Sequence, residues 1–345
     1  MFDLDKVVRK NIKTLKPYSC ARDEYKGKEA IFMDANENPY DTGFNRYPDP
    51  LQSELKEKIA QLKNVHPNQI FLGNGSDEAI DLMFRAFCEP RIDNAITIHP
   101  SYGMYPVCAD INDVEMRKVL LNEDFSLNTK SIFSSVDKNT KLIFICSPNN
   151  PTANYFPDDV VLDVVKNFDG IVIVDEAYID FSDKAGLLSC LNEYPNLVIF
   201  QTFSKAWGMA GIRLGIAFAH PAIVNILNKI KYPYNVNVNT QTIALEALKD
   251  LSQKDMWVKM ILAQKKFLIE ELLKISFVKK IFPSDANFFL AQVDEPKAIY
   301  EFLVEKKIIL RDRSNLELLE NCLRITVGTE EENIELLNAL KIFKS

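Results

Sequence analysis

Residues capable of chemistry follow four short apolar segments of the chain. The pairs are Ile70–Leu72 with Gly73–Glu78, Leu142–Cys146 with Ser147–Thr152, Ile171–Val174 with Asp175–Tyr178, and Leu197–Phe200 with Thr202–Lys205. A glycine turn before a helix places free backbone amides where they can bind an anion such as phosphate. Asp175, which follows four apolar residues, is costly to bury unless a cation lies beside it. Together the segments indicate a site with an anion-binding turn, a buried carboxylate and a lysine.

Each of these segments, taken alone, also fits an ordinary structural role. Glycine before a helix is mostly turn chemistry, and Asp77 with Glu78 suits the positive end of a helix dipole. Ser147–Thr152 also fits a proline-rich turn in which asparagine bonds its own backbone. The interpretation as one site therefore depends on whether the fold brings the four segments together.

The apolar segments predict an α/β fold with a mainly parallel sheet covered by helices. They are short, largely apolar and followed by polar or turn residues. After Gly75, the residues Ile80, Met83, Phe84 and Phe87 recur at the spacing of a helix with one apolar face. In open sheets of this class, ligands bind at the carboxyl ends of the strands, where the polar segments fall. The predicted strands are Ile70–Leu72, Ala95–Ile98, Leu142–Cys146, Ile171–Val174, Leu197–Phe200 and Gly215–Ala219.

Past Trp257 the pattern changes to that of a smaller α+β unit. At 345 residues the chain exceeds the usual size of a single core, so we expect two domains. Residues 1–45 are expected to form an N-terminal arm and part of the small domain, residues 46–255 the large domain, and residues 256–345 the small C-terminal domain. The predicted elements are a helix at Lys265–Ile275, strands at Phe288–Val293, Ile308–Arg311 and Leu323–Val327, and a last helix that begins at Thr329 with a capping box to Glu332.

The composition excludes several classes of protein. A net charge of −7 argues against general binding to nucleic acid or anionic membranes, because phosphates select for positive surfaces. No apolar run approaches the roughly 20 residues that span a bilayer, and the opening segment lacks the apolar core of a signal peptide. The six cysteines are scattered without a CxxC, and the three histidines are far apart. We therefore expect buried thiols, no metal site and a cytoplasmic location.

Three motifs, in this order and spacing, resemble those of the fold-type-I pyridoxal-phosphate-dependent aminotransferases. They are SPNNPT (residues 147–152), VDEAY (174–178) and FSKAWGMAGIRLG (203–215). The resemblance runs from Asp34 to the C-terminal helix and implies the cofactor pyridoxal 5'-phosphate. By this resemblance Lys205 is the catalytic residue and holds the cofactor as a Schiff base, for which its amine must be neutral. Asp175 would pair with the pyridinium nitrogen, so that the ring can take up electrons.

The resemblance also assigns the remaining cofactor contacts. Asn150 and Tyr178 would hydrogen-bond the phenolic oxygen of the cofactor ring. Tyr102 would stack on that ring, although it also fits an ordinary core aromatic. The phosphate would be held by backbone amides and charge-assisted contacts. The residues implied for it are Ser76, Asp77, Ser204, Arg213 and, as a further candidate, Thr202.

Motifs near the two ends resemble a narrower family, the histidinol-phosphate aminotransferases. They are DANENPY (34–40), RYPDP (46–50) and LRITVGT (323–329). In that family the arginine at the position of Arg324 clamps the amino-acid carboxylate, a task that suits its planar fork. The tyrosine at the position of Tyr47 reaches the cofactor phosphate of the neighbouring subunit, which implies a homodimer with shared active sites. Tyr18, Arg311 and Asn36 resemble substrate-binding residues, although Arg311 also fits a surface salt bridge.

This second resemblance implies a transamination in L-histidine biosynthesis. L-Histidinol phosphate and 2-oxoglutarate would give imidazole-acetol phosphate and L-glutamate, with Lys205 moving the proton at the substrate Cα. One anion site would then bind the phosphate of one substrate and a carboxylate of the other, and we assign it to Arg324 and Arg311 with Tyr18. The alternatives are an aromatic or other phospho-amine aminotransferase, and a decarboxylase of phosphorylated amino acids. A non-catalytic cofactor sensor is disfavoured, because the proton-transfer lysine is present.

One position departs from the family pattern. The family usually has glycine after NNPT, where this chain has Ala153. If that position needs a positive φ, the Cβ costs about 1 kcal/mol. We expect a slightly different turn there that leaves the assignment of Asn150 intact.

Overall fold

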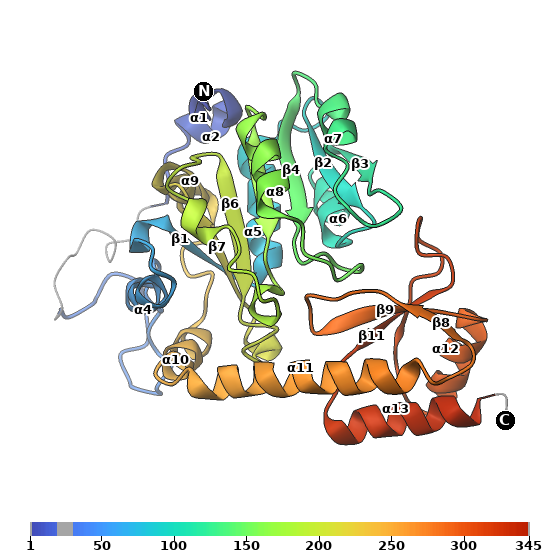
Figure 1. Ribbon diagram of the computed structural model, residues 1–345. Helices are drawn as coiled ribbons and strands as arrows, with labels where there is room; N and C mark the ends of the chain where they lie inside the picture. The colour runs from blue at the N-terminus through green and yellow to red at the C-terminus, as the bar shows by residue number, and fades with distance from the viewer. Residues whose placement is uncertain (1, 19–29, 344–345) are drawn as a thin grey trace.

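The larger of two sheets forms the body of the molecule in the computed structural model, which describes residues 2–18 and 30–343. Its strands are β1 (Ile70–Asn74), β2 (Asn94–His99), β3 (Glu115–Leu120), β4 (Thr140–Cys146), β5 (Ile171–Asp175), β6 (Leu197–Thr202) and β7 (Leu214–Ala219). They lie in the order β1-β7-β6-β5-β4-β2-β3 (Figure 1). Paired strands run parallel, except that β7 is antiparallel to both β1 and β6. The predicted mainly parallel α/β sheet is therefore confirmed.

Both faces of this sheet are buried under helices. In β4, Ile143 and Ile145 face one hydrophobic cluster and Phe144 faces the other, because successive side chains of a strand point to opposite faces. Burial on both sides explains why the strands are almost continuously apolar. One face carries α1 (Leu4–Val7), α2 (Lys10–Thr14), α5 (Ser76–Phe87), α6 (Met104–Ile111) and α9 (Pro221–Ile230), and the other carries α4 (Ser53–Lys63), α7 (Thr129–Ser135), α8 (Asp158–Lys166) and α10 (Val238–Ala247).

A smaller antiparallel sheet lies beside the large one. Its strands are β8 (Val278–Ile281), β9 (Phe288–Val293), β10 (Arg311–Asp312) and β11 (Cys322–Thr326), in the order β10-β11-β9-β8. Two helices, α12 (Pro296–Glu305) and α13 (Glu330–Ile342), share a hydrophobic cluster with it. The capping box predicted at the start of α13 is confirmed, because Thr329 and Glu332 each cap the other's backbone amide. Short 3-10 helices occur at Pro67–Gln69, Ile179–Phe181, Leu188–Cys190 and Ala210–Ile212.

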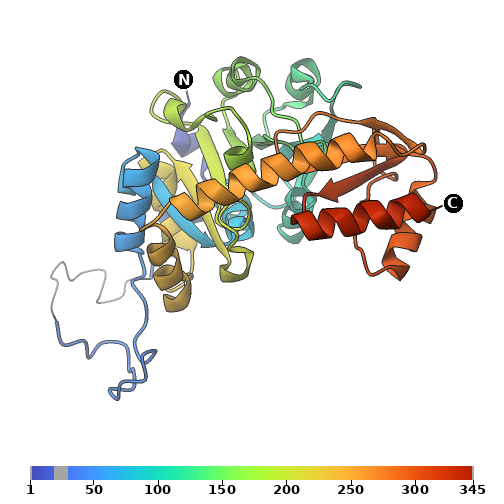
Figure 2. The ribbon, with the colours of Figure 1, turned by 60° about the horizontal axis from the view of Figure 1, so that its bottom comes forward.

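One long helix, α11 (Ser252–Leu272), joins the two parts and runs along both sheets (Figures 1 and 2). Near its start, Lys254 lies 3.4 Å from Asp180 of the large part. Near its end, Leu268 and Leu272 are buried in the cluster of the small sheet. The expected division of the chain near residue 255 therefore falls inside a continuous helix, and that division stays a prediction. Within residues 2–18 and 30–343, no helix has the length and apolar character needed to cross a membrane.

The structure corrects several predicted bounds. The helix predicted at Lys265–Ile275 begins at Ser252 instead, and of the strand predicted at Ile308–Arg311 only Arg311 is in β10. Strands β3 and β8 were missed. Charged residues make up half of each strand, and both strands lie at a sheet edge, so neither shows the apolar run of a central strand.

The first helices pack on the large sheet rather than on the small one. Val7, Val8 and Ile12 are buried in the cluster that contains α5, and Arg9 forms an ion pair with Glu89 at 3.2 Å. Residues 4–14 therefore lie against the large sheet, and the expectation that part of residues 1–45 belongs to the small domain stays a prediction.

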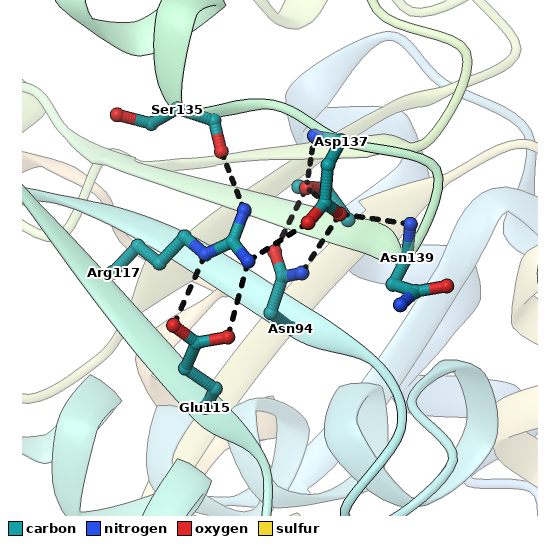
Figure 3. A network of polar contacts seen from close by, with 7 residues as sticks. Asn94, Glu115, Arg117, Ser135, Asp137 and Asn139 are labelled. Atoms are coloured by element: carbon teal, nitrogen blue, oxygen red, sulfur yellow. Dashed lines mark hydrogen bonds and ion pairs between the residues drawn. The ribbon is translucent and has the colours of Figure 1, made fainter.

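A polar network holds the edge of the large sheet at the amino ends of its strands (Figure 3). Arg117 of β3 donates to Asp137 and to the carbonyl of Ser135, both at 2.8 Å, and Asn94 of β2 donates to Asp137 at 3.0 Å. The hydrogen bonds from Asn94 and Arg117 hold the pKa of Asp137 well below its usual range. The network ties β2 and β3 to the loop that enters β4, at the end of the sheet opposite the polar segments that follow β1, β4, β5 and β6.

Glu176 is a fully buried acid just after β5. Its carboxylate accepts from the amide of Leu187 at 2.7 Å and from the side chain of Gln201 at 2.9 Å. Gly186 packs so closely that a Cβ there would lie 2.6 Å from the Glu176 carboxylate. Burial raises the pKa of Glu176 to about 7, since the hydrogen bonds only partly offset desolvation.

Glu176→Gln should change how stability depends on pH. Because the folded pKa of Glu176 lies above its unfolded value, the native protein loses stability as pH rises from about 4.5 to about 7. Between pH 5 and pH 7 this loss amounts to about 2 kcal/mol. In denaturant titrations at several pH values, the free energy of unfolding should therefore fall by that much less in the glutamine variant. Identical pH profiles of the unfolding free energy for the two proteins would contradict the raised pKa of Glu176.

Candidate active site

The carboxyl ends of β1, β4, β5 and β6 surround a cavity of about 140 Å³, here called the inner cavity. It opens beside a second space of about 510 Å³, the outer cavity, and the two share Tyr102, Asn150, Tyr178 and Lys205. Of the fourteen side chains predicted for the site, nine line the inner cavity. They are Ser76, Asp77, Tyr102, Asn150, Asp175, Tyr178, Ser204, Lys205 and Arg213.

Lys205 lies three residues past β6, on the floor between the two cavities. Its pKa is lowered, first by burial and then by the positive charge of Arg324. The Nζ atom lies 5.5 Å from the ring centroid of Tyr178. A lysine whose ammonium form is disfavoured can attack a carbonyl carbon or exchange a proton with a bound molecule.

Asp175, the last residue of β5, is buried with only neutral hydrogen-bond donors. Its carboxylate accepts from the hydroxyl of Tyr105 at 2.6 Å and from the amide of Ala177 at 3.1 Å. Burial raises the pKa of Asp175, and the hydrogen bond from Tyr105 opposes that rise. A protonated ring nitrogen in the inner cavity would supply the cation that this carboxylate lacks.

Tyr105 is a site residue that the sequence analysis missed. It is fully buried in α6, and burial followed by the charge of Asp175 raises its pKa well above the usual value. The phenol is therefore a permanent donor. Its ring stacks on Phe144 with centroids 4.9 Å apart and meets Tyr102 edge to face. Tyr102 precedes α6 and Tyr105 lies in its first turn, so the sequence carried no helical spacing that could have linked the two.

The anion-binding end of the inner cavity is built by close backbone approach. Gly75 has φ +77°, and a Cβ there would lie 2.5 Å from Nη2 of Arg213, so the guanidinium lies directly over the turn before α5. A Cβ at Gly215 would lie 2.3 Å from the amide nitrogen of Ser76, so only glycine lets β7 come this near. The turn therefore offers helix amides and an arginine to one anion.

Hydroxyl and carboxylate groups complete this end. Ser204 and Thr202 pair their hydroxyls at 3.0 Å, and Thr202 also lines the cavity. Asp77 accepts from the hydroxyl of Tyr102 at 3.1 Å and lies 3.2 Å from Nη2 of Arg213. Asp77 thus orients the aromatic ring and the arginine on either side of the space.

Asn150 connects the two sheets. Its amide donates to the hydroxyl of Tyr178 at 3.4 Å, and its carbonyl oxygen accepts from Nη1 of Arg324 at 2.5 Å. The turn that carries it has φ +66° at Ala153, which is fully buried against Tyr178 and Phe288. The position does have a positive φ, so the Cβ cost applies there, and Asn150 still lines the cavity. The expected difference in the turn stays a prediction.

The outer cavity is strongly basic. Arg324 and Arg311 face each other across the β10–β11 ladder, so both side chains lie on one face of the small sheet. Both line the outer cavity, as predicted for substrate-binding residues, and so do Arg313 and Lys118, which the sequence analysis missed. The motif search passed over these two because neither belongs to a motif: Lys118 lies in the missed edge strand and Arg313 in a loop.

Three predicted residues do not reach either cavity in this chain. Tyr18 is 74% exposed, and Tyr47 is 50% exposed with its ring stacked on Tyr234. Asn36 lies exposed in the same N-terminal segment, which extends away from the body of the molecule (Figure 2). Their roles stay predictions, and that of Tyr47 was expected across a subunit interface.

The residues of the inner cavity fit pyridoxal phosphate from end to end. The turn at Ser76 with Arg213 fits the phosphate, and Asp175 fits the ring nitrogen. Lys205 has the amine for the aldehyde carbon. The aromatic and amide side chains beside the space for the cofactor ring are those of Tyr102, Tyr178 and Asn150.

Tyr105→Phe should weaken cofactor binding. The change keeps the ring but removes the donor to Asp175, so the pKa of Asp175 rises further and less carboxylate is available to a protonated ring. A hydrogen bond to a charged group contributes about 1.5–3 kcal/mol, so affinity for pyridoxal phosphate should fall roughly ten- to a hundredfold. Fluorescence titration of the cofactor-free protein from pH 6 to pH 8 measures this. Tyr300→Phe, in α12, is the control, and equal affinities for the Tyr105 variant and wild type would refute the role.

Comparison with known proteins places this site in a family. A model of the class I and II aminotransferases matches residues 25–340. A histidinol-phosphate aminotransferase from Bacteroides fragilis is 54% identical over 345 residues, covering all of both chains. That from Clostridium acetobutylicum aligns in three dimensions with a TM-score of 0.80 and 27% identity, over 87% of this chain and 90% of the other.

A further solved structure bears on the fold. The histidinol-phosphate aminotransferase from Sinorhizobium meliloti, solved with pyridoxal-5'-phosphate, aligns with a TM-score of 0.78 and 22% identity over 86% of this chain and 82% of the other. The predicted fold-type-I architecture is confirmed by these alignments. With its arrangement of lysine, carboxylate and anion-binding turn, the chain belongs to the class I and II aminotransferases and, within them, to the histidinol-phosphate aminotransferases.

Proposed function

We propose that this chain is a pyridoxal-phosphate enzyme that transfers the amino group of L-histidinol phosphate to 2-oxoglutarate. The products are imidazole-acetol phosphate and L-glutamate, in the biosynthesis of L-histidine. The names of relatives that are 51–54% identical over the whole chain support the substrate. The observation that carries the proposal is the basic outer cavity, which opens directly onto Lys205 and suits anionic substrates.

The residues of the chain divide the work between binding and proton transfer. When bound, the cofactor supplies an electron sink for the bonds at the substrate Cα. Asp175 would keep the ring nitrogen protonated. Lys205 would hold the cofactor through its amine and would carry the proton to and from Cα, which its lowered pKa favours.

Arginines orient the substrate against Lys205. Arg324 is held by Asn150 at 2.5 Å, beside the position of the cofactor ring. It binds the phosphate of histidinol phosphate and, in the second half of the cycle, the α-carboxylate of glutamate. Arg311, opposite Arg324 in the ladder, adds the second charge that a phosphate dianion needs. The substrate amine is thereby presented to the same atoms in both half-reactions.

The active unit of this proposal is a homodimer in the cytoplasm. The N-terminal segment exposes large apolar side chains that a partner subunit would cover, among them Ile31 at 91%, Met33 at 90% and Tyr40 at 79%. Tyr47 extends from this segment to the cofactor phosphate of the neighbouring subunit, and Tyr18 and Asn36 to its substrate. The described cysteines are unpaired thiols, as a reducing compartment requires.

Histidinol phosphate should discharge the absorbance of the lysine-bound cofactor when it is mixed with the loaded protein. 2-Oxoglutarate should then restore that absorbance and yield glutamate. Lys205→Ala should lose both the lysine-bound absorbance and the exchange, because no amine remains to carry the proton. Carbon dioxide release from a phosphorylated amino acid, without a response to histidinol phosphate, would replace this function with a decarboxylase. A yellow lysine-linked adduct in Lys205→Ala would refute the role of Lys205.

Mixing two inactive variants should recover activity if the sites are shared. In an equal mixture of Tyr47→Phe and Lys205→Ala subunits, half of the dimers are hybrids, and one of the two sites in each hybrid is intact. Activity should therefore rise from the level of the separate variants toward about a quarter of wild type. No rise after proven subunit exchange would mean that Tyr47 does not act across an interface.

A further inference from the structure

The two substrates of the proposed reaction differ most at the group farthest from the anchor on Arg324. In histidinol phosphate, one arm of the reacting carbon ends in a phosphate and the other in an imidazole. In glutamate, one arm is the α-carboxylate and the other ends in a second carboxylate. The same part of the outer cavity must therefore accept a neutral ring in one half-reaction and an anion in the other. Burying that carboxylate without a cation would be costly.

Arg313 lies beside the two arginines that are assigned to the anchor. Arg311 and Arg324 are partners across the β10–β11 ladder, and the amide of Arg313 continues this ladder with a 3.0 Å bond to the carbonyl of Cys322. Arg313 directly follows β10, and it is close enough to Arg311 for that charge to lower its pKa. Arg313 lines the outer cavity with them.

The guanidinium of Arg313 is poorly neutralised by the protein. Its Nε is buried and has no hydrogen-bond partner in residues 2–18 and 30–343. Burial lowers its pKa, and the charge of Arg311 lowers it further. The acids near it have other partners. Asp312 accepts from the amide and hydroxyl of Ser314, and Glu317 lies 3.5 Å from His99.

A second cation enters the same cavity from the large sheet. Lys118 of β3 pairs with Thr97 of β2, and both residues line the outer cavity. Lys118 is exposed, and no ion pair within the described part of the chain includes it. Burial lowers the pKa of His99, which lines the cavity as well, and the positive charge of Lys118 lowers it further. The cavity thus has Arg313 on its small-sheet side and Lys118 on its large-sheet side.

We infer that Arg313 and Lys118 form a distal anion subsite that binds the side-chain carboxylate of glutamate and 2-oxoglutarate. This inference rests on the proposed function and assigns its second substrate to residues. Arg313 supplies the direct charge-assisted contact and Lys118 a supporting charge across the cavity. Histidinol phosphate places its imidazole in the same space and needs neither cation there. The two residues therefore determine specificity for one half-reaction only.

Separate measurement of the two half-reactions tests the subsite. With Arg313→Gln, the KM for 2-oxoglutarate and for glutamate should rise roughly ten- to a hundredfold, the range expected when a charged hydrogen bond is lost. With Lys118→Gln the rise should be smaller, and Arg313→Lys should recover part of the loss. The KM for histidinol phosphate should stay within about twofold throughout. The controls are Arg91→Gln and Lys297→Gln, whose side chains are 83% exposed and line neither cavity.

Unreactive acids separate this inference from the proposed function. Glutarate has both carboxylates but no group to transfer, and butyrate has only one. The loaded wild-type protein should bind glutarate more tightly than butyrate, and Arg313→Gln should abolish that preference without weakening butyrate. An equal loss for both acids, an equal rise in KM for histidinol phosphate, or an unchanged glutarate affinity would each overturn the subsite. Failure of the proposed function would appear differently, as a wild-type protein that does not respond to histidinol phosphate.

Discussion

The buried carboxylate of Asp175 is the constraint on which the rest of the site depends. A carboxylate at the end of a central strand is unfavourable by itself, and the chain compensates it only in part, with one phenol and one amide. In the proposed function, a cationic ring in the inner cavity would supply the missing positive charge, so the burial of Asp175 would strengthen and orient cofactor binding. The donor from Tyr105 limits how far the pKa of Asp175 rises, and the aromatic packing of Tyr105 fixes the direction of that donor.

The ends of the strands and two glycines then position the other groups of the site relative to Asp175. The phosphate end depends on two close approaches, that of β7 to the Ser76 amide and that of Arg213 to Gly75, and a side chain at either glycine would open the turn. The substrate end depends on the small sheet, where the β10–β11 register places two arginines side by side. Asn150 joins the two ends, because it contacts both Tyr178 beside the cofactor and Arg324 beside the substrate. The site is therefore assembled from two sheets that the sequence separates widely.

Much of this could be predicted from sequence, because the relevant residues follow apolar strands or belong to motifs. Lys205, Asp175 and Arg213 fall at strand ends, where topology alone brings side chains together. Tyr105 was missed because a buried tyrosine looks the same in sequence whether or not its hydroxyl meets a carboxylate. Arg313 and Lys118 were missed because neither belongs to a motif, and only the fold brings both to the outer cavity. Tyr18, Asn36 and Tyr47 lie outside both cavities of this chain, and the predicted contact of Tyr47 belongs to a second subunit.

The continuous helix α11 constrains how the two halves of the site can move. Its 21 residues extend about 30 Å, and it contacts the large part near its start and the small sheet near its end. A helix is stiff along its axis, so α11 keeps the distance between the two sheets constant. The small sheet can still tilt relative to the large one. Such tilting would move Arg311, Arg313 and Arg324 together, toward or away from Lys205. Changes in the width of the outer cavity would then be collective, with all three guanidinium groups advancing on a substrate together.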